Sequence, residues 1–369
     1  MSQHLQPPSY RIAISTSGGD APGINAVIRT IVISGLNRGW QVFGVHDGFH
    51  GLIEPEKYDD KGLIELSKEA VTGITHLGGT ILGASHRDNT LFFPTLTLDV
   101  QLVDDDLITK VANNLRLNKI DVLIAIGGDE SLKIANALSL KNISVIAIPK
   151  TIDNNLDKTD ATIGFDSAVE YATKILDRLR TAKANDGVII VEVMGQETGW
   201  IALYAGFSGS ANIILIPEIP YVIDNVIQKI QQCNAHGDEF PLIVVAEGAR
   251  PIGKDFQVSG NNLDELDRTG ENVAREINTL TRKQVEVIVL GHLLRGGAPT
   301  VFDRFLAIRL GGAAVRAIEQ GNSGKMIVIS SSKISCVPIS TVVSSGKPID
   351  LNCDIIKTAR DMGISFGDS

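Results

Sequence analysis

Three loops rich in glycine and aspartate carry the residue types that phosphate chemistry needs. The first, residues 15–25, contains Gly18, Gly19 and Asp20. Glycines let backbone N–H groups approach an anionic ligand, and the start of a following helix favours negative charge. No Gly-Lys-Ser/Thr follows, so the loop is not a Walker loop. The segment is interpreted either as a phosphate cradle or as a tight strand-to-helix turn.

The second loop, residues 127–131, has the sequence Gly-Gly-Asp-Glu-Ser. Its two glycines admit phosphate, and Asp129 beside them can hold Mg²⁺, which prefers carboxylate and phosphate oxygens. The alternative is a helix N-cap, with Asp129 or Ser131 as the capping residue. The two interpretations are compatible.

The third loop, residues 148–155, reads Ile-Pro-Lys-Thr-Ile-Asp-Asn-Asn. Asp153 could accept the proton of an attacking hydroxyl, and Lys150 could neutralise phosphate charge. Phosphoryl transfer needs mostly positioning and charge neutralisation, with a base that orients the nucleophile. Without the other two loops, a plain Asn/Asp turn would explain this segment equally well.

Short β-branched apolar runs precede these loops and recur along the chain. They are nearly continuous, which is typical of strands covered on both faces, and helical stretches alternate with them. Strands are expected at residues 11–15, 41–45, 121–126, 144–148, 188–193, 212–216, 242–246, 285–290 and 326–330, and helices at 25–37, 105–115, 131–138, 167–180 and 263–280. The pattern predicts two parallel sheets of βαβ units, with ligands bound beyond the carboxyl ends of the strands. Residues 254–262 are expected to form an exposed loop, and residues 331–349 an irregular connection.

Composition narrows the classes of protein. A chain of 369 residues with 43% hydrophobic residues predicts about two domains. The net charge of −9, without a Lys/Arg-rich block, argues against a nucleic-acid partner. Three scattered cysteines, no secretion signal and no apolar run of about 18 residues predict a cytoplasmic protein that does not enter a membrane.

Across almost its whole length the sequence resembles the phosphofructokinase family, whose members use ATP or pyrophosphate. The matching motifs are at residues 18–23, 78–83, 127–129, 149–153, 163–168, 191–195, 216–218 and 290–297. The resemblance implies an α/β fold of two Rossmann-like lobes with mainly parallel sheets and the active site in the cleft between them. Residues 1–164 plus 294–344 would form the donor-binding lobe, and residues 165–293 plus 345–369 the acceptor-binding lobe.

The resemblance also assigns roles to individual residues. The catalytic residues would be Asp153 as the proton acceptor, Lys150 and Thr151. The donor would be bound by Gly18, Gly19, Arg87, Gly128, Asp129, Glu130 and Ser131, with Asp129 also holding Mg²⁺. The acceptor would be bound by Thr151, Ile152, Asp153, Met194, Gly195, Gln196, Glu247, His292 and Arg295. His292 and Arg295 match the pair that grips the sugar phosphate, a role that suits arginine because it binds phosphate through two N–H groups. Taken alone, His292 would more simply be a packed histidine at a strand end.

Several positions depart from the family pattern. Gln196 replaces the usual arginine after Met-Gly, and Asn155 replaces a second aspartate. Gly187 and Glu286 stand where an adjacent subunit usually supplies arginines, unless Lys183, Arg282 or Lys283 takes their place. Arg87 lies one position away from the place of the family's donor-binding arginine. The acceptor could therefore be fructose 6-phosphate or another sugar or polyol, and a weakly active or regulatory paralogue is a third alternative.

The donor also stays open. In this family a glycine after Gly-Gly-Asp leaves room for ATP, whereas an aspartate there, with lysine before Thr-Ile-Asp, accompanies pyrophosphate. This chain has Glu130, which is closer to the pyrophosphate pattern. Its Lys150 discriminates poorly between the two donors, because ATP-using members also carry this lysine. The predicted activity is a glycolytic 6-phosphofructokinase-type transfer from ATP or pyrophosphate, with Mg²⁺, in a homodimer or homotetramer.

Overall fold

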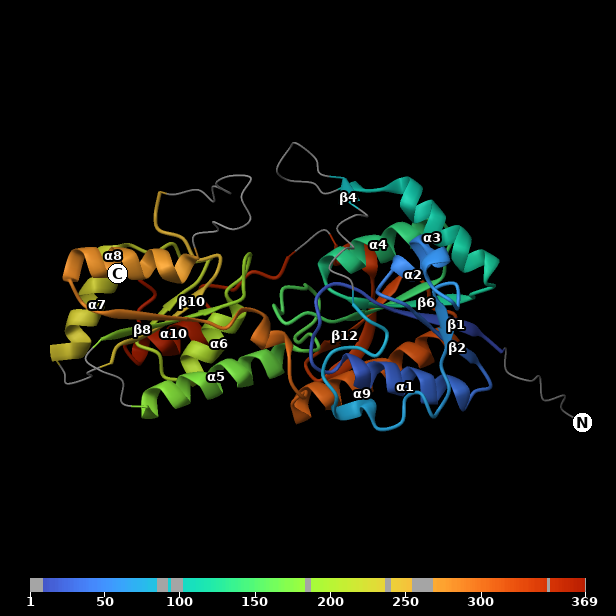
Figure 1. Cartoon of the computed structure of the whole chain (residues 1–369), viewed down its shortest axis with the longest axis horizontal. Helices are drawn as coiled ribbons and strands as arrows, with labels where there is room; N and C mark the ends of the chain where they lie inside the picture. The colour runs from blue at the N-terminus through green and yellow to red at the C-terminus, as the bar shows by residue number, and fades with distance from the viewer. Residues whose placement is uncertain are drawn as a thin grey trace, which may run out of the picture. The chain divides into compact units, whose positions relative to one another are not determined.

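The computed structural model describes residues 9–84, 92–93, 102–182, 187–235, 240–253, 268–343 and 346–368. The chain divides into two compact units (Figure 1). The first consists of Met1–Thr151, Leu156–Gly164 and Arg295–Gly346, and the second of Ile152–Asn155, Phe165–Leu294 and Lys347–Ser369. The short stretch Ile152–Asn155, which the resemblance assigned to the first lobe, therefore clusters with the second unit.

The first unit is built on a seven-stranded sheet in the order β13-β12-β7-β6-β1-β2-β3. Its strands are β1 (Arg11–Thr16), β2 (Gln41–Val45), β3 (Leu63–Glu65), β6 (Val122–Gly127), β7 (Val145–Pro149), β12 (Lys325–Ser330) and β13 (Lys333–Pro338). The five inner strands pair in parallel, and both edge strands are antiparallel to their neighbours. Every residue of β6 and β7 is buried, as their continuous apolar sequences predict.

Helices cover the sheet of the first unit. On one side α1 (Ile24–Leu36) packs against α9 (Val301–Glu319), which also contacts β7 and β12. A separate apolar core joins α2 (His50–Ile53), α3 (Asp105–Leu117) and α4 (Asp129–Leu140) to the central strands. The remaining elements are short: η1 (Pro55–Lys57), η2 (Ile74–His76), η5 (Ile339–Thr341) and the pair β4 (Phe92–Phe93) and β5 (Leu102–Val103).

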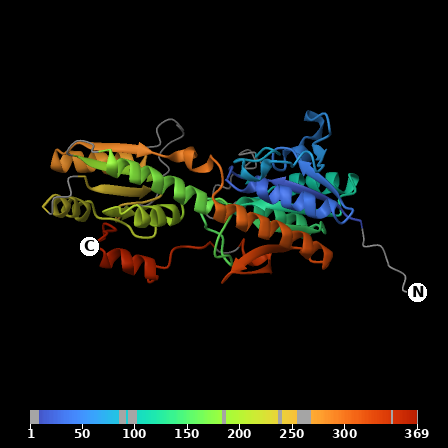
Figure 2. The ribbon, with the colours of Figure 1, turned by 90° about the horizontal axis from the view of Figure 1, so that it is seen from below.

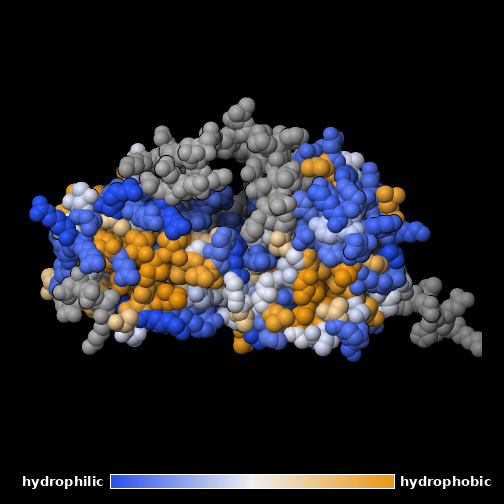
Figure 3. Space-filling view, in the orientation of Figure 1, coloured by the Kyte–Doolittle hydropathy of each residue, from blue (hydrophilic) through white to orange (hydrophobic). Residues whose placement is uncertain are grey.

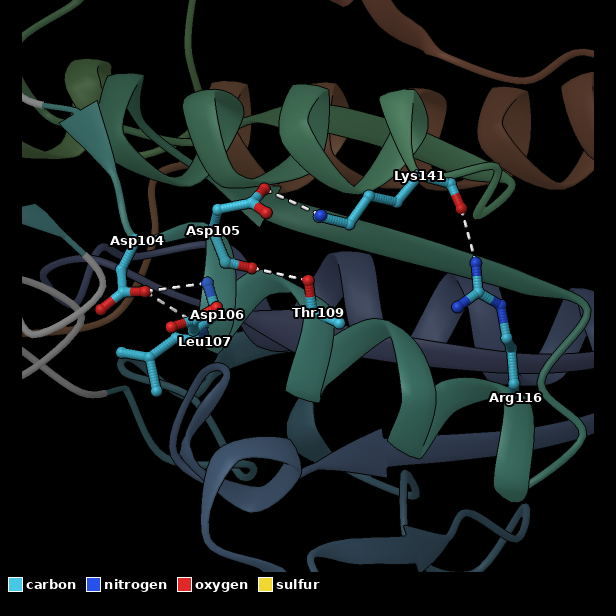
Figure 4. A network of polar contacts seen from close by, with 7 residues as sticks. All are labelled: Asp104, Asp105, Asp106, Leu107, Thr109, Arg116 and Lys141. Carbon is cyan, nitrogen blue, oxygen red and sulfur yellow. Dashed lines mark hydrogen bonds and ion pairs between the residues drawn. The ribbon is translucent and has the colours of Figure 1, made fainter.

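Polar contacts fix the start of α3 and tie it to α4 (Figure 4). The side chain of Asp104 caps the helix, accepting hydrogen bonds from the N–H groups of Asp106 (2.9 Å) and Leu107 (3.2 Å). At Lys141, just past α4, the ammonium pairs with Asp105 (2.8 Å) and the carbonyl accepts from Arg116 (2.6 Å). These contacts brace the two helices beside the strand that precedes the second loop.

The second unit has a four-stranded parallel sheet in the order β11-β8-β10-β9. Its elements are α5 (Phe165–Thr181), β8 (Val188–Val193), α6 (Trp200–Ser208), β9 (Ile213–Leu215), α7 (Ile223–Ala235), β10 (Leu242–Ala246), α8 (Thr269–Thr281), β11 (Val285–Val289), η4 (Gly291–Arg295) and α10 (Asp354–Asp361). Helix α8 packs on β8, β10 and β11 and against α7, whereas α6 packs on β9 and β10 and against α5. No helix among the described residues is long and apolar enough to span a membrane.

The structure confirms the predicted α/β class with mainly parallel sheets, and all nine predicted strands are present. One prediction is wrong. Residues 333–338 form β13 rather than an irregular connection, and their burial alternates because β13 is an edge strand with one covered face. The predicted loop at 254–262 and the start of the predicted helix at 263 lie outside the described residues.

Candidate active site

The three candidate loops start side by side in the first unit, although the third passes into the second unit at Ile152. They follow β1, β6 and β7, which lie side by side and parallel in the sheet. The carboxyl ends of parallel neighbours meet at one sheet edge, so the loops emerge together, as the sequence predicted. The N–H of Ser17 continues the pairing by donating to the carbonyl of Ile126 at 3.1 Å.

Lys150 joins the third loop to the first. Its buried ammonium donates hydrogen bonds to the carbonyl oxygens of Ser17 (2.8 Å) and Gly19 (2.7 Å). A second link joins the first loop to the Gly-Gly-Asp loop, where the Ser17 and Ser131 hydroxyls lie 2.5 Å apart. Lys150 thus holds the backbone of the predicted phosphate cradle, which is a positioning role beside the charge neutralisation expected of it.

The first of the two glycines in the first loop has a left-handed backbone conformation, and the second lies close against the Arg295 side chain. Gly18 has φ +77°, and a Cβ there would lie 3.5 Å from the Lys150 ammonium. A Cβ on Gly19 would lie only 2.5 Å from Nη1 of Arg295, which also donates a long hydrogen bond to the carbonyl of Asp20 (3.5 Å). Arg295 therefore packs on the first loop within the first unit, whereas the exposed His292 belongs to the second.

Asp129 begins α4, and the helix is capped by Gly128 without a side-chain hydrogen bond. The alternative interpretation of this loop, in which Asp129 or Ser131 caps the helix, is therefore wrong. The Asp129 carboxylate instead pairs with Lys133 at 2.6 Å, with 40% of its side chain exposed, and Ser131 contacts Ser17. Glu130 follows in the first helical turn and is partly buried.

The carboxylates near the loops suit a metal ion that is bound together with a phosphate ligand. The described residues contain no group of three or more His, Cys, Asp or Glu side chains that could hold an ion by themselves. Mg²⁺ is commonly bound through one or two carboxylates together with substrate phosphates and water. The exposed carboxylate of Asp129, beside the glycines of the second loop, fits that kind of site.

The predicted acceptor residues of the second unit lie on two joined loops. Met194–Gln196 follows β8 and Glu247 follows β10, which is the adjacent strand. The N–H of Gly195 donates to the Glu247 carboxylate (3.3 Å), and the N–H of Gly248 donates to the carbonyl of Gly195 (3.1 Å). A Cβ on Gly248 would lie 1.9 Å from the carbonyl of Gln196, so this approach requires glycine.

Glu192 is a buried acid near this loop pair that the sequence analysis did not single out. Its carboxylate accepts a hydrogen bond from the N–H of Gly270 (2.7 Å), in the first turn of α8. Burial raises the pKa of Glu192, the Gly270 N–H opposes that rise, and nearby Glu247 adds to it. The available signal was an acidic residue within the otherwise apolar run 188–193. Glu192 anchors the start of α8, where the Thr269 hydroxyl also donates to the Glu247 carbonyl (2.5 Å).

Gly187 and Glu286 lie at the other end of these strands. Gly187 precedes β8, and Glu286 is the second residue of β11, paired with Ile189. Met194 follows the far end of β8, roughly 20 Å away at about 3.3 Å per strand residue. Neither position can reach the Met194 loop of its own chain. Arg282 and Lys283 lie at the same end as Gly187, whereas Lys183 and Arg87 fall outside the described residues.

Asp153 sits in the stretch Ile152–Asn155 of the second unit. Its neighbours hold the backbone firmly: Ile152 is fully buried, and Asn154 is 2% exposed with a left-handed φ of +50°. Just before them, the carbonyl of Thr151 accepts from the Thr162 hydroxyl (2.6 Å). The Oδ1 atom of Asn155 is buried with no hydrogen-bond partner in the described part of the chain. Asp153 itself is partly exposed, as a residue that meets a ligand must be.

Comparisons with known proteins agree with these motifs. The family model described as Phosphofructokinase matches residues 11–318. The chain is 41% identical over 360 residues to the ATP-dependent 6-phosphofructokinase of Chloroflexus aurantiacus, covering 97% of this chain and 98% of that one. It is 38% identical to ATP-dependent 6-phosphofructokinase 2 of Clostridium perfringens, covering 99% and 100%.

A solved structure shows the same fold. Pichia pastoris phosphofructokinase in the T-state superposes with a TM-score of 0.77 at 29% identity, over 91% of this chain and 36% of that one. The family match spans both units and includes all three loops joined by Lys150 and Ser17. On these grounds the chain belongs to the phosphofructokinase family.

Proposed function

We propose that this protein is a 6-phosphofructokinase that transfers the terminal phosphoryl group of ATP to a hydroxyl of fructose 6-phosphate. The observation that carries the proposal is the joining of three loops, by Lys150 and by the Ser17–Ser131 contact, into one phosphate-binding edge. Relatives about 40% identical over the full chain bear the name of this activity, which supports ATP as the donor.

The roles follow from the chemistry. Asp153 takes the proton as the acceptor oxygen bonds to phosphorus and the bond to the leaving nucleotide breaks. The first two loops offer backbone N–H groups to the donor phosphates, and Lys150 keeps the first loop in shape. Asp129 would hold Mg²⁺, which neutralises phosphate charge when it is bound. Glu247 and the Met194–Gln196 loop bind the sugar in the second unit.

A panel of acceptors tests the proposal directly. Fructose 6-phosphate, fructose, other sugar phosphates and polyols are assayed with ATP and with pyrophosphate, each with Mg²⁺ and in excess EDTA. The highest kcat/KM is expected for fructose 6-phosphate with ATP, and turnover should disappear in EDTA. A higher kcat/KM for another sugar or a polyol would show that fructose 6-phosphate is not the preferred acceptor. No turnover with any pair of donor and acceptor would support a regulatory paralogue.

Glu130 is expected to limit the use of ATP. It follows Asp129 in the first turn of α4, and its bulk and charge would oppose a nucleotide α-phosphate at this edge. Glu130→Gly should raise kcat/KM for ATP several-fold relative to that for pyrophosphate. Glu130→Gln keeps the bulk and removes the charge, so the pair of variants separates the two effects. Unchanged donor ratios in both variants would show that Glu130 points away from the donor.

A second copy of the chain is proposed to complete the acceptor site. Strand β11 is the open edge of its sheet, and its residues are only partly covered. Apolar residues gather on the surface where this strand crosses the second unit (Figure 3). Uncovered edges of this kind are normally protected by another element or chain. Since Gly187 and Glu286 cannot reach their own Met194 loop, they are the positions that would face a partner's acceptor.

Restoring positive charge at these two positions should strengthen acceptor binding. The double variant Gly187→Arg/Glu286→Arg is expected to lower the KM for fructose 6-phosphate by at least ~10-fold, because each charge-assisted contact contributes roughly 1.5–3 kcal/mol. Steady-state kinetics measure it, with Glu286→Gln as the control for removing repulsion alone. A wild-type KM already in the low micromolar range, unaltered in the double variant, would mean that other cations fill the pocket.

A further inference from the structure

The segment that follows Gly346 runs along the loop that carries Asp153 (Figure 2). The N–H of Lys347 donates a hydrogen bond to the carbonyl of Asn155 at 3.0 Å. Asn155 ends the short stretch Ile152–Asn155, two residues past Asp153, and both partners belong to the second unit. The C-terminal segment therefore fixes the backbone on one side of the proposed base.

Lys347 is in turn contacted by Trp200, the first residue of α6. The indole N–H donates to the Lys347 carbonyl at 2.8 Å, and the Lys347 ammonium lies 5.3 Å from the centre of the indole ring. A cation over the face of tryptophan is attracted by the ring's electrons. Tyr204 packs against the Trp200 ring with the ring centres 5.9 Å apart, and Tyr204 in turn contacts Phe165 at 5.2 Å. Trp200 thus holds both the main chain and the side chain of Lys347.

Glu218 makes a second attachment two residues further on. Its carboxylate accepts from the N–H of Ile349 (3.3 Å) and from the N–H of Gly199 (3.2 and 3.1 Å to its two oxygens). Burial raises the pKa of Glu218, and these N–H donors oppose that rise. Gly199 is the N-cap of α6 and lies three residues after Gln196. One carboxylate therefore fastens the C-terminal segment to the helix that follows the acceptor loop.

We propose that Lys347–Ile349 is a strap that sets the position of Asp153 relative to the Met194–Gln196 loop, with Trp200 and Glu218 as positioning residues. The inference rests on the proposed function, because it assumes that Asp153 acts on the acceptor hydroxyl. The strap reaches Asp153 through Asn155 and reaches the acceptor loop through Gly199, entirely within the second unit. It should therefore affect kcat more than donor binding, since small displacements of a reacting group cost much of the rate.

Trp200→Phe is the first test, because it removes the indole N–H and keeps an aromatic ring against Tyr204. Trp40, the only other tryptophan in the chain, gives the matched control Trp40→Phe; it is buried in the first unit against Tyr10. Trp200→Phe is expected to lower kcat about tenfold with the KM for the donor nearly unchanged, whereas Trp40→Phe keeps kcat. Equal kcat in the two variants would overturn the proposal.

Hydrogen–deuterium exchange of the peptide containing residues 152–156 gives a readout that does not depend on turnover. Exchange at this peptide should be faster in Trp200→Phe than in wild type or Trp40→Phe, with peptides of β6 and β7 unchanged. If the protein is inactive with every acceptor but shows this local change in exchange, the proposed function is wrong and the strap proposal stands. Unchanged exchange at residues 152–156 would rule out the strap proposal, whatever the kinetics show.

A second pair of variants covers the case in which Trp200→Phe does not fold. Glu218→Ala removes both attachments of the carboxylate, whereas Glu218→Gln keeps an oxygen that can accept from Ile349 or Gly199. The alanine variant should show the same loss of kcat and the same faster exchange, and glutamine should restore most of both. Equal defects in the two variants, or defects spread over the whole second unit, would count against a positioning role.

Discussion

Replacing Asp153 with serine is expected to lower kcat by at least ~100-fold, the usual contribution of a general base. The side chain lies in a stretch whose backbone is held by buried Ile152 and Asn154, so the loop should keep its conformation without the carboxylate. The KM for the donor should change little, because the first two loops, which are proposed to bind the donor, belong to the first unit and Asp153 belongs to the second. Steady-state kinetics and a thermal melt measure the three quantities.

Asp157→Ser is the matched control for this prediction. Asp157 lies four residues later in the chain and pairs with the neighbouring Lys158 at the surface. Its loss should leave kcat within about twofold of wild type, since ion pairs between partly exposed side chains contribute little. Near-normal turnover in Asp153→Ser would show that another group accepts the proton.

Lys150→Met is expected to produce the second-largest loss, about 100-fold in kcat/KM for the donor, because displacing a binding loop by about 1 Å can cost that much. Methionine fills a similar volume without a donor, so the carbonyls of Ser17 and Gly19 would lose the ammonium that now orders them. Leaving the buried Ser17 carbonyl unsatisfied also costs roughly 1–3 kcal/mol, which predicts a lower melting temperature. Donor-dependent kinetics and thermal unfolding in the absence of substrate measure these two effects separately.

The exposed Lys333 at the start of β13 gives a matched control. Lys333→Met removes the same charge at a position far along the chain from the three candidate loops. It should change neither kinetics nor melting temperature. If Lys150→Met melts like wild type and loses only activity, the ammonium acts on the donor phosphates rather than on the backbone of the cradle.

The strands and the three loops were predictable because their signals are local. Continuous β-branched runs such as 122–127 leave few alternatives to a buried strand, and the Gly-Gly-Asp and Thr-Ile-Asp segments follow them directly. Strand β13 was missed because its Lys-Ile-Ser-Cys alternation is short and polar, and its pairing with β12 depends on a tight turn. Helix α6 has apolar residues all round, so its sequence carries no helical period to read.

The contacts between loops were not predictable, since they depend on which strands become neighbours. Lys150 meets Gly19 across 131 residues and Arg295 meets Asp20 across 275 residues, only because the sheet and η4 bring them together. Sequence reasoning assigned Lys150 to the phosphate and Arg295 to the sugar phosphate. Their contacts with the donor-loop backbone required the fold.

The order of strands in the first unit also bears on how the protein folds as it is synthesised. The inner strand β7 pairs with β6 on one side and with β12 on the other, yet β12 spans Lys325–Ser330. When a ribosome has released residues 1–164, this sheet still lacks β12 and β13, and β7 has an open side. All four strands of the second unit, which end at Val289, emerge first. The sheet of the first unit therefore closes only after the strands of the second unit have emerged, and the last segment of the second unit, Lys347–Ser369, follows later still. Neither unit is complete until the end of synthesis, unlike domains that fold one after another from the N-terminus.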